Sequence, residues 1–278
     1  MQTSTDVTGF LRHINACRDA RLPGERVALR IGEALVGWVD PAAAEAMRGF
    51  PEIAVTEHGL RLTEPESLER IARTLARRGL SRWRGEAFDV RVRPDGPVLA
   101  RVDRGALPVL GIEAVGVHVN GLVERADGPH LWVARRAADK ALDPGKLDHI
   151  VAGGVPTGLT PDETVVKEAA EEAAIPAALA RQAMLVGAIT YAMDRPEGLR
   201  RDILRCYDLT VPADFLPRAA DGEVESFALW PLTQVLVTVR ETDDFKFNVN
   251  LVLIDLFLRR RLVTGSAGAA LRAALDAA

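Results

Sequence analysis

The chain has 278 residues, of which 48% are hydrophobic and 27% are charged, a balance typical of a folded globular protein. This length allows one large domain or two of medium size. The formal net charge of −4 provides no bulk electrostatic attraction to nucleic acid, so we expect no nucleic-acid partner.

The cysteines and the apolar runs narrow the class of protein further. Cys17 and Cys206 are too few for a disulfide scaffold and have no zinc-site spacing. The most apolar run, residues 249–258, is interrupted by Asn250 and Asp255, so we expect no membrane span. The first twenty residues lack the basic start and apolar core of a secretory leader. We therefore predict a cytoplasmic protein without a membrane partner.

Residues 1–107 are predicted to form a small α+β domain without a dense group of catalytic residue types. Helices are expected at 10–20, 41–47 and 64–78. Strands are expected at 26–30, 34–39, 53–55, 59–62, 88–92 and 98–102. Residues 107–109 are interpreted as the linker to a second domain, which spans residues 108–278.

The second domain is predicted to combine strands with two main helices. Strands are expected at 116–121, 131–134, 185–191 and 202–209. Helices are expected at 161–175, 232–239 and 247–261, and the alanine-rich tail after Gly265 is interpreted as a frayed helix. This alternation indicates an α/β/α sandwich within an α+β protein.

The helix that follows Thr160 has the clearest start in the chain. Thr160 and Glu163 have the spacing of a capping box, and Pro161 occupies the first helical position. Val165, Ala169 and similar small apolar residues form a stripe that can pack closely against a sheet.

Three acids lie on one face of this helix. Glu168 precedes Glu171 by three residues and Glu172 by four, so the carboxylates lie within about one helical turn of each other. Like charges this close either hold a divalent cation or form a solvated acidic face. Gly153, Gly154 and Gly158, before the helix, are interpreted as a flexible loop whose backbone can approach a metal or a phosphate.

Basic and polar residues before this helix are candidates for substrate binding. Arg135, Lys140 and Lys146 could neutralise phosphate charge, or they could be solvated loop cations. His118 and Asn120 share one face of a predicted strand and could line a pocket, although a satisfied core histidine is the commoner outcome.

The stretch from Gly153 to Ile175 resembles the box of the Nudix (MutT-like) hydrolases in its spacing. The resemblance implies a Nudix α/β/α sandwich with a mixed sheet, in which Glu168, Glu171, Glu172 and the Gly153 carbonyl bind Mg²⁺, with Mn²⁺ as an option. Lys167 stands where the family has an arginine that orients an acid. Three positions depart from the family pattern: Leu159, Lys167 and Ala174.

The family also implies a catalytic acid after the box. Glu223 or Glu225 could supply it, and the alternative is an ordinary acidic turn. The implied reaction is hydrolysis of a phosphoanhydride bond in a small organic diphosphate. Glu168, Glu171, Glu172, Lys167 and Glu223 are therefore the predicted catalytic residues.

A narrower resemblance concerns the two-domain Nudix group related to thiamin pyrophosphokinase, whose N-terminal domain has no assigned function. It rests on the stretches 9–15, 116–121 and 144–148. The implied substrate is thiamin diphosphate, or its oxidised analogues, cleaved to the monophosphate. A homodimer is compatible with this reading.

Two other functions remain open. A decayed box could bind a diphosphate compound without cleaving it. The turn at residues 144–148 also resembles isopentenyl-diphosphate isomerase relatives, whose reaction needs a cysteine beside the metal. No cysteine lies in the strands just before the box, and Cys206 is an uncertain substitute.

Overall fold

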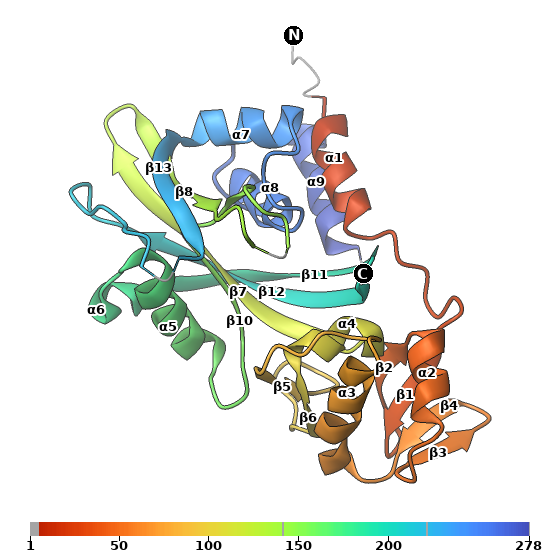
Figure 1. Ribbon diagram of the computed structural model, residues 1–278. Coiled ribbons are helices and arrows are strands. Elements are labelled where there is room, and N and C mark those ends of the chain that lie inside the picture. The colour runs from red at the N-terminus through yellow and green to blue at the C-terminus, as the bar shows by residue number, and fades with distance from the viewer. Residues whose placement is uncertain (1–5, 141, 221, 278) are drawn as a thin grey trace.

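A mixed sheet runs through the larger part of the molecule and carries helices on both faces (Figure 1). The structure is a computed structural model and describes residues 6–140, 142–220 and 222–277. The strand order is β11 (Met184–Arg195), β12 (Gly198–Thr210), β7 (Glu113–Arg125), β8 (Gly128–Arg136) and β13 (Val224–Pro231). Strand β10 (Val151–Gly154) pairs with β7, and β9 (Leu147–Asp148) pairs with β8. Strands β7 and β12 are parallel, and the other neighbours are antiparallel.

Strand β7 shows how the two faces of the sheet differ. Val117 and Val119 point to one face, where they pack with α5 (Pro161–Ala173) and α6 (Ala177–Ala180). Leu122 points to the other face, which is covered by α7 (Leu232–Glu241), α8 (Val249–Arg259) and α9 (Gly265–Asp276) (Figure 1). Because side chains alternate along a strand, the even-numbered residues 118 and 120 also point toward α8.

The first helix of the chain belongs to the core on the α8 side. Helix α1 (Thr8–Ala16) buries Phe10 and Ile14 against α7, α8 and α9. Cys17, directly after the helix, lies in the same core. The division at residue 107 stays a prediction, but this helix packs with the part of the chain that lies beyond it.

The rest of the N-terminal part has its own sheet and its own core. Its strand order is β2 (Ala34–Val39), β1 (Val27–Ile31), β4 (Gly59–Leu62) and β3 (Ile53–Thr56). A separate pair consists of β5 (Ala87–Val90) and β6 (Ala100–Asp103). The helices are α2 (Pro41–Met47), η1 (Pro65–Ser67), α3 (Leu68–Arg77) and η2 (Arg104–Ala106). The predicted α+β class is confirmed for both parts.

Residues 107–109, interpreted as the linker, lie in helix α4 (Leu107–Leu110), which buries Leu107, Val109 and Leu110. Two local predictions were wrong. The alanine-rich tail is not frayed, since α9 buries Leu271 and Leu275 in the core. Gly153 and Gly154 are not in a flexible loop but end strand β10. In both cases packing against the rest of the chain decided the local structure.

None of the helices in the described residues combines the length and the apolar character that a membrane crossing needs.

Candidate active site

Helix α5 carries the three acids and begins where the capping signal predicts. The side chain of Thr160 accepts a hydrogen bond from the Glu163 amide at 3.2 Å, and Glu163 accepts one from the Thr160 amide at 2.8 Å. Both halves of the capping box are therefore formed. The helix ends at Ala174, which has a left-handed backbone with φ 53°.

Two of the three acids converge on strand β10. The Glu172 carboxylate is buried and accepts a hydrogen bond of 2.8 Å from the Ala152 amide. Glu168 packs on Gly153 so closely that a Cβ at Gly153 would lie 2.5 Å from the Glu168 carboxyl carbon. A larger residue at position 153 would therefore displace the Glu168 carboxylate from its place beside the strand.

Burial and repulsion between carboxylates raise the pKa values of Glu168 and Glu172. Burial, followed by the charges of Asp148, Glu168 and Glu223, raises the pKa of Glu172 well above its usual value. Burial also raises the pKa of Glu168, and the neighbouring carboxylates Glu171 and Glu86 add to this effect. Such carboxylates gain most when a cation neutralises them.

Lys167 balances part of this charge in the described structure. Its ammonium lies 3.0 Å from Glu168 and 2.6 Å from Glu171. Although burial alone would lower it, these hydrogen bonds raise the pKa of Lys167. A cation that binds to Glu168 and Glu171 must therefore compete with Lys167 or move it.

Glu223 and Lys140 form an ion pair on the β13 side of the site. The Ala137 amide donates a hydrogen bond of 3.0 Å to the Glu223 carbonyl, which joins the loop after β8 to the start of β13. Burial alone would raise the pKa of Glu223, but Lys140 and then Arg104 lower it. The negative charge of Glu223 in turn raises the pKa of Glu172. The structure therefore brings Glu223 into electrostatic range of Glu172, and Lys140 pairs with Glu223.

Arg135 and Lys146 are held by loops instead. Arg135 donates a hydrogen bond of 2.9 Å to the Gly145 carbonyl, and Lys146 donates one to the Asp243 carbonyl. These contacts tie both cations to backbone rather than to the carboxylates of α5.

His118 and Asn120 point away from α5, toward α8. Asn120 donates a hydrogen bond of 2.8 Å to Asp208, which forms an ion pair with Arg259 of α8. His118 is buried, and its Nδ1 lies 3.0 Å from the Nδ1 of His149. The structure does not bring these two residues together with the acids, and it favours the alternative of a satisfied core histidine.

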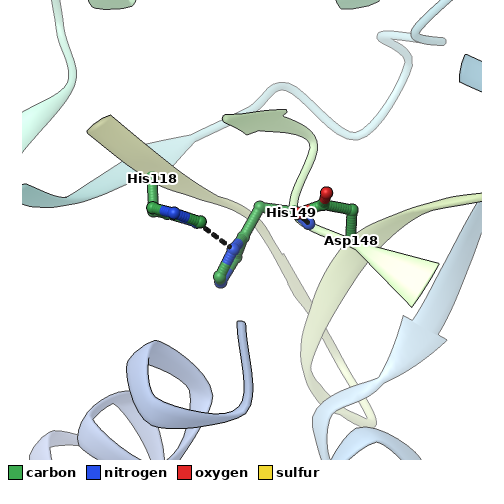
Figure 2. A group of neighbouring side chains, drawn as sticks. All are labelled: His118, Asp148 and His149. Atoms are coloured by element: carbon green, nitrogen blue, oxygen red, sulfur yellow. Dashed lines mark hydrogen bonds between the residues drawn. The ribbon is translucent and has the colours of Figure 1, made fainter. Parts of the chain in front are cut away.

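A second group of metal-ligating types was missed at the sequence level. His118, Asp148 and His149 are all buried, and their ligand atoms lie within 4.8 Å of one another. Figure 2 shows the two imidazoles meeting edge to face through a hydrogen bond, with Asp148 beside His149. We call these three residues the histidine cluster, and Glu168, Glu171, Glu172 and the Gly153 backbone the acidic site. The Asp-His pair just before the box was the available signal, but only strand pairing brings His118 to it.

The histidine cluster already has a surplus of positive charge around it. Asp148 lies 2.8 Å from Arg136 and 3.6 Å from Lys246. Burial lowers the pKa of His149 to about 4 and the pKa of His118 well below its usual value, so both imidazoles are neutral at pH 7. A divalent cation bound here would face two buried cations at close range.

The two donor sets also favour different metals. The acidic site offers only oxygen ligands, which suit Mg²⁺ and Mn²⁺, and its carboxylates outnumber its one ammonium. The histidine cluster mixes imidazole nitrogen with carboxylate oxygen, a set typical of transition metals. The residues of the acidic site therefore fit Mg²⁺ better.

Cys206 does not lie with the acids. Its side chain is buried in the core on the α8 side and approaches the Leu204 carbonyl. Burial raises the pKa of this thiol to about 12, so it is not ionised at neutral pH. The isomerase alternative, which needs a reactive cysteine beside the metal, has no support at this position.

Comparison with known proteins identifies the class. Residues 115–250 match the family described as NUDIX domain, and residues 9–114 match a domain of unknown function, DUF4743. Nudix hydrolase 20 of Arabidopsis thaliana is 38% identical over 94% of this chain and 75% of its own length. Nudix hydrolase 24 of the same plant is 37% identical over the same shares. The chain therefore belongs to the Nudix hydrolase family, which typically hydrolyses pyrophosphate linkages.

Solved structures with a similar fold include DR0079 from Deinococcus radiodurans, at 20% identity and a TM-score of 0.47, covering 60% of this chain and 97% of that one. The NUDIX domain of Shewanella oneidensis NrtR complexed with ADP ribose has 15% identity and a TM-score of 0.43, covering 54% of this chain and 89% of that one.

The predicted cytoplasmic location was wrong. Both Arabidopsis relatives carry the word chloroplastic in their names. The composition and the cysteine count report on folding and on redox conditions, and these properties do not distinguish one reducing compartment from another.

Proposed function

We propose that this Nudix hydrolase cleaves the phosphoanhydride bond of a small organic diphosphate and releases the monophosphate. The observation that carries the proposal is the convergence of Glu168 and Glu172 on strand β10. Two carboxylates with raised pKa values, side by side on rigid elements, are costly unless they hold a cation.

The cation proposed is Mg²⁺, held by Glu168, Glu171, Glu172 and the Gly153 carbonyl. When bound, it supplies a more acidic water and neutralises diphosphate oxygens. Lys167, which contacts Glu168 and Glu171, keeps both carboxylates oriented toward the same volume. Removal of Lys167 is expected to misplace Glu168 and Glu171, while all three metal-binding carboxylates remain present.

Glu223 and Lys140 are proposed to act on the substrate side. Because Lys140 lowers its pKa, Glu223 is ionised at neutral pH and can accept a proton from the attacking water. Lys140 can then pair with a phosphate oxygen in exchange for Glu223. The exchange would leave the Glu223 carboxylate available for the proton.

Thiamin diphosphate and its oxidised analogues are the proposed substrates, on the strength of the narrower sequence resemblance. The test is product analysis with Mg²⁺ on these compounds, nucleoside diphosphate sugars, NADH and nucleoside triphosphates. Monophosphate formed from the thiamin compounds would support the full proposal. Cleavage of another member would retain the hydrolase and discard the thiamin assignment.

A binding module that does not cleave its ligand is the second candidate. The ion pairs of Lys167 with two of the acids favour it, because they oppose entry of a metal. In that case a diphosphate compound would raise the melting temperature, while no monophosphate would form with Mg²⁺. Appearance of monophosphate in a metal-dependent manner would exclude this candidate.

A further inference from the structure

We propose that the N-terminal part, which matches a domain of unknown function, completes the diphosphate site with Arg104. The proposal deepens the function proposed above and rests on it. Arg104 begins the short helix η2 and lies outside the Nudix-matching residues 115–250. Its role would be to bind phosphate oxygens that face away from the acidic site.

Strand β5 of the N-terminal part is joined to the loop between β10 and α5. The Thr157 amide donates a hydrogen bond of 2.8 Å to the Ala87 carbonyl. The Thr157 hydroxyl donates another, of 2.9 Å, to Asp89. In Figure 1 this loop descends from the sheet and lies beside β5. The two bonds hold β5 next to the loop that leads into the helix of the acids.

The N-terminal part approaches strand β10 closely at Gly154. A Cβ at Gly154 would lie 2.6 Å from Cζ of Phe88 and 3.8 Å from Cζ of Arg104. Gly154 directly follows Gly153, against which Glu168 packs. Gly153 therefore leaves space for Glu168 of α5, and Gly154 leaves space for Phe88 of the N-terminal part.

Two contacts orient the Arg104 guanidinium without consuming it. Its Nη1 donates a hydrogen bond of 2.9 Å to Glu86, and its Cζ lies 5.8 Å from the centre of the Phe88 ring. The bond to Glu86 uses one of the five N–H donors of an arginine. The side chain is 51% exposed, so the remaining donors can reach a ligand. Phe88 itself is buried and supports Arg104 rather than offering a stacking surface.

The charge of Arg104 reaches the proposed catalytic residues. Together with Lys140, it lowers the pKa of Glu223. Its partner Glu86 contributes to the raised pKa of Glu168. An arginine fork binds two phosphate oxygens at once, whereas the ammonium of Lys140 acts as a point charge. A diphosphate that bridges the acidic site and Glu223 would therefore meet Arg104 on its N-terminal side.

Arg73 provides a matched control within the same part of the chain. It lies over the ring of Trp83 at 4.5 Å, pairs with Glu69 at 3.2 Å and is 52% exposed. Arg73, on α3, therefore has the same kinds of contact as Arg104: one glutamate and one aromatic ring. Its glutamate and its ring do not belong to the acidic site. Arg73→Ala and Arg104→Ala each remove one surface cation and one cation–aromatic contact, so the two variants differ only in the place of the arginine.

The test is calorimetric binding of methylenediphosphonate, which cannot be hydrolysed, in the presence of Mg²⁺ to the full chain. Arg104→Ala is expected to raise Kd about 10- to 100-fold, as loss of a charged hydrogen-bonding partner does. Arg104→Lys should retain part of the affinity, and Arg73→Ala should stay within about twofold of the wild type. KM for the cleaved substrate should rise in parallel, with a smaller change in kcat.

Unchanged affinity in Arg104→Ala would overturn the proposal, and so would failure of the wild type to bind the probe. If Arg104→Ala does not fold, Arg104→Met keeps an unbranched apolar stem beside Phe88 and removes the charge. Loss of binding in the Arg104 variants without cleavage of any tested diphosphate would refute the hydrolase proposal and leave the Arg104 site standing. Cleavage with unchanged binding would do the reverse.

Discussion

The acidic site and the histidine cluster are both groups of metal-ligating side chains, and they differ in burial and in how their charge is balanced. All three residues of the histidine cluster are buried, whereas Glu172 is buried and Glu171 is exposed in the acidic site. In the acidic site, the ammonium of Lys167 faces the carboxylates Glu168 and Glu171, and Glu172 lies beneath them. In the histidine cluster, the carboxylate of Asp148 faces Arg136 and Lys246. In the acidic site the carboxylates outnumber the cations, whereas in the histidine cluster the cations outnumber the carboxylate.

This difference shows that ligand type alone does not define a cation site. The histidine cluster satisfies the distance criterion for a metal, but its surroundings favour a neutral pair of imidazoles that bond to each other. In the acidic site, burial and the repulsion between carboxylates raise the pKa of Glu172. A bound cation would offset both effects. The two groups are separated mainly by what the neighbouring strands and helices contribute.

The largest expected effect is that of Glu172→Gln on turnover. The variant keeps an oxygen that can accept the Ala152 amide, but it removes a ligand charge. Loss of residues that only orient metal ligands costs about 10- to 100-fold, so we expect kcat to fall by more than about 1000-fold. The melting temperature should not decrease, because a buried carboxylate with a raised pKa destabilises the fold when ionised.

The control is Glu241→Gln, an exposed glutamate on α7. Its turnover should equal that of the wild type. Retained turnover in Glu172→Gln would remove Glu172 from the catalytic set, and a large loss of melting temperature would assign it a structural role.

The next effect concerns the histidine cluster and the pH dependence of stability. The pKa of His149 is lowered from 6.5 to about 4 in the folded state, so the unfolded chain binds more protons in this range. The contribution of His149 is therefore complete above pH 6.5 and is lost as the pH falls toward 4. The loss amounts to about 3 kcal/mol of unfolding free energy, at 1.36 kcal/mol for each pKa unit.

Urea denaturation between pH 7 and pH 4 measures this slope. His149→Asn should make it less steep, with the buried His118 still contributing because its pKa is also lowered by burial. His58→Asn, at an exposed histidine, should leave the slope unchanged. Asp148 lies beside His149 and titrates at lower pH, since Lys246 and Arg136 lower its pKa. An identical slope in wild type and His149→Asn would show that the cluster is not neutral and buried in solution.

A third prediction separates the two groups by metal binding. Mg²⁺ at ten times its Kd should stabilise the folded chain by about 1.4 kcal/mol. Thermal melts should lose this stabilisation in Glu168→Gln and keep it in His149→Asn. The reverse result would transfer the Mg²⁺ site to the histidine cluster and would end the assignment to α5.

The smallest expected effect lies at the end of the helix that carries the acids. Ala174 adopts a left-handed backbone, which costs a residue with a Cβ about 1–2 kcal/mol. Ala174→Gly should therefore raise the unfolding free energy by about 1 kcal/mol after the entropy of the glycine is counted. Ala170→Gly, inside the same helix, should destabilise by a similar amount. Destabilisation by Ala174→Gly would contradict this account of the helix end.

The sequence by itself determined the parts of the site that depend on local geometry. The capping box at Thr160, the start of α5 and the common face of Glu168, Glu171 and Glu172 follow from helical spacing. The family follows from the same stretch, since the spacing of the box belongs to one helix and one preceding strand. The α/β/α sandwich and the small α+β N-terminal domain were predicted from the strand and helix patterns, and the mixed sheet from the family resemblance.

Only the tertiary structure decided which residues meet across elements. Pairing of β10 with β7 sets His118 beside His149, and alternation along β7 turns His118 and Asn120 away from the acids. Gly153 and Gly154 lie in strand β10, where the absence of a side chain leaves space for Glu168 and Phe88. The approach of Arg104 joins segments about fifty residues apart in the chain. Long-range contacts of this kind depend on strand pairing and close packing, which no local spacing encodes.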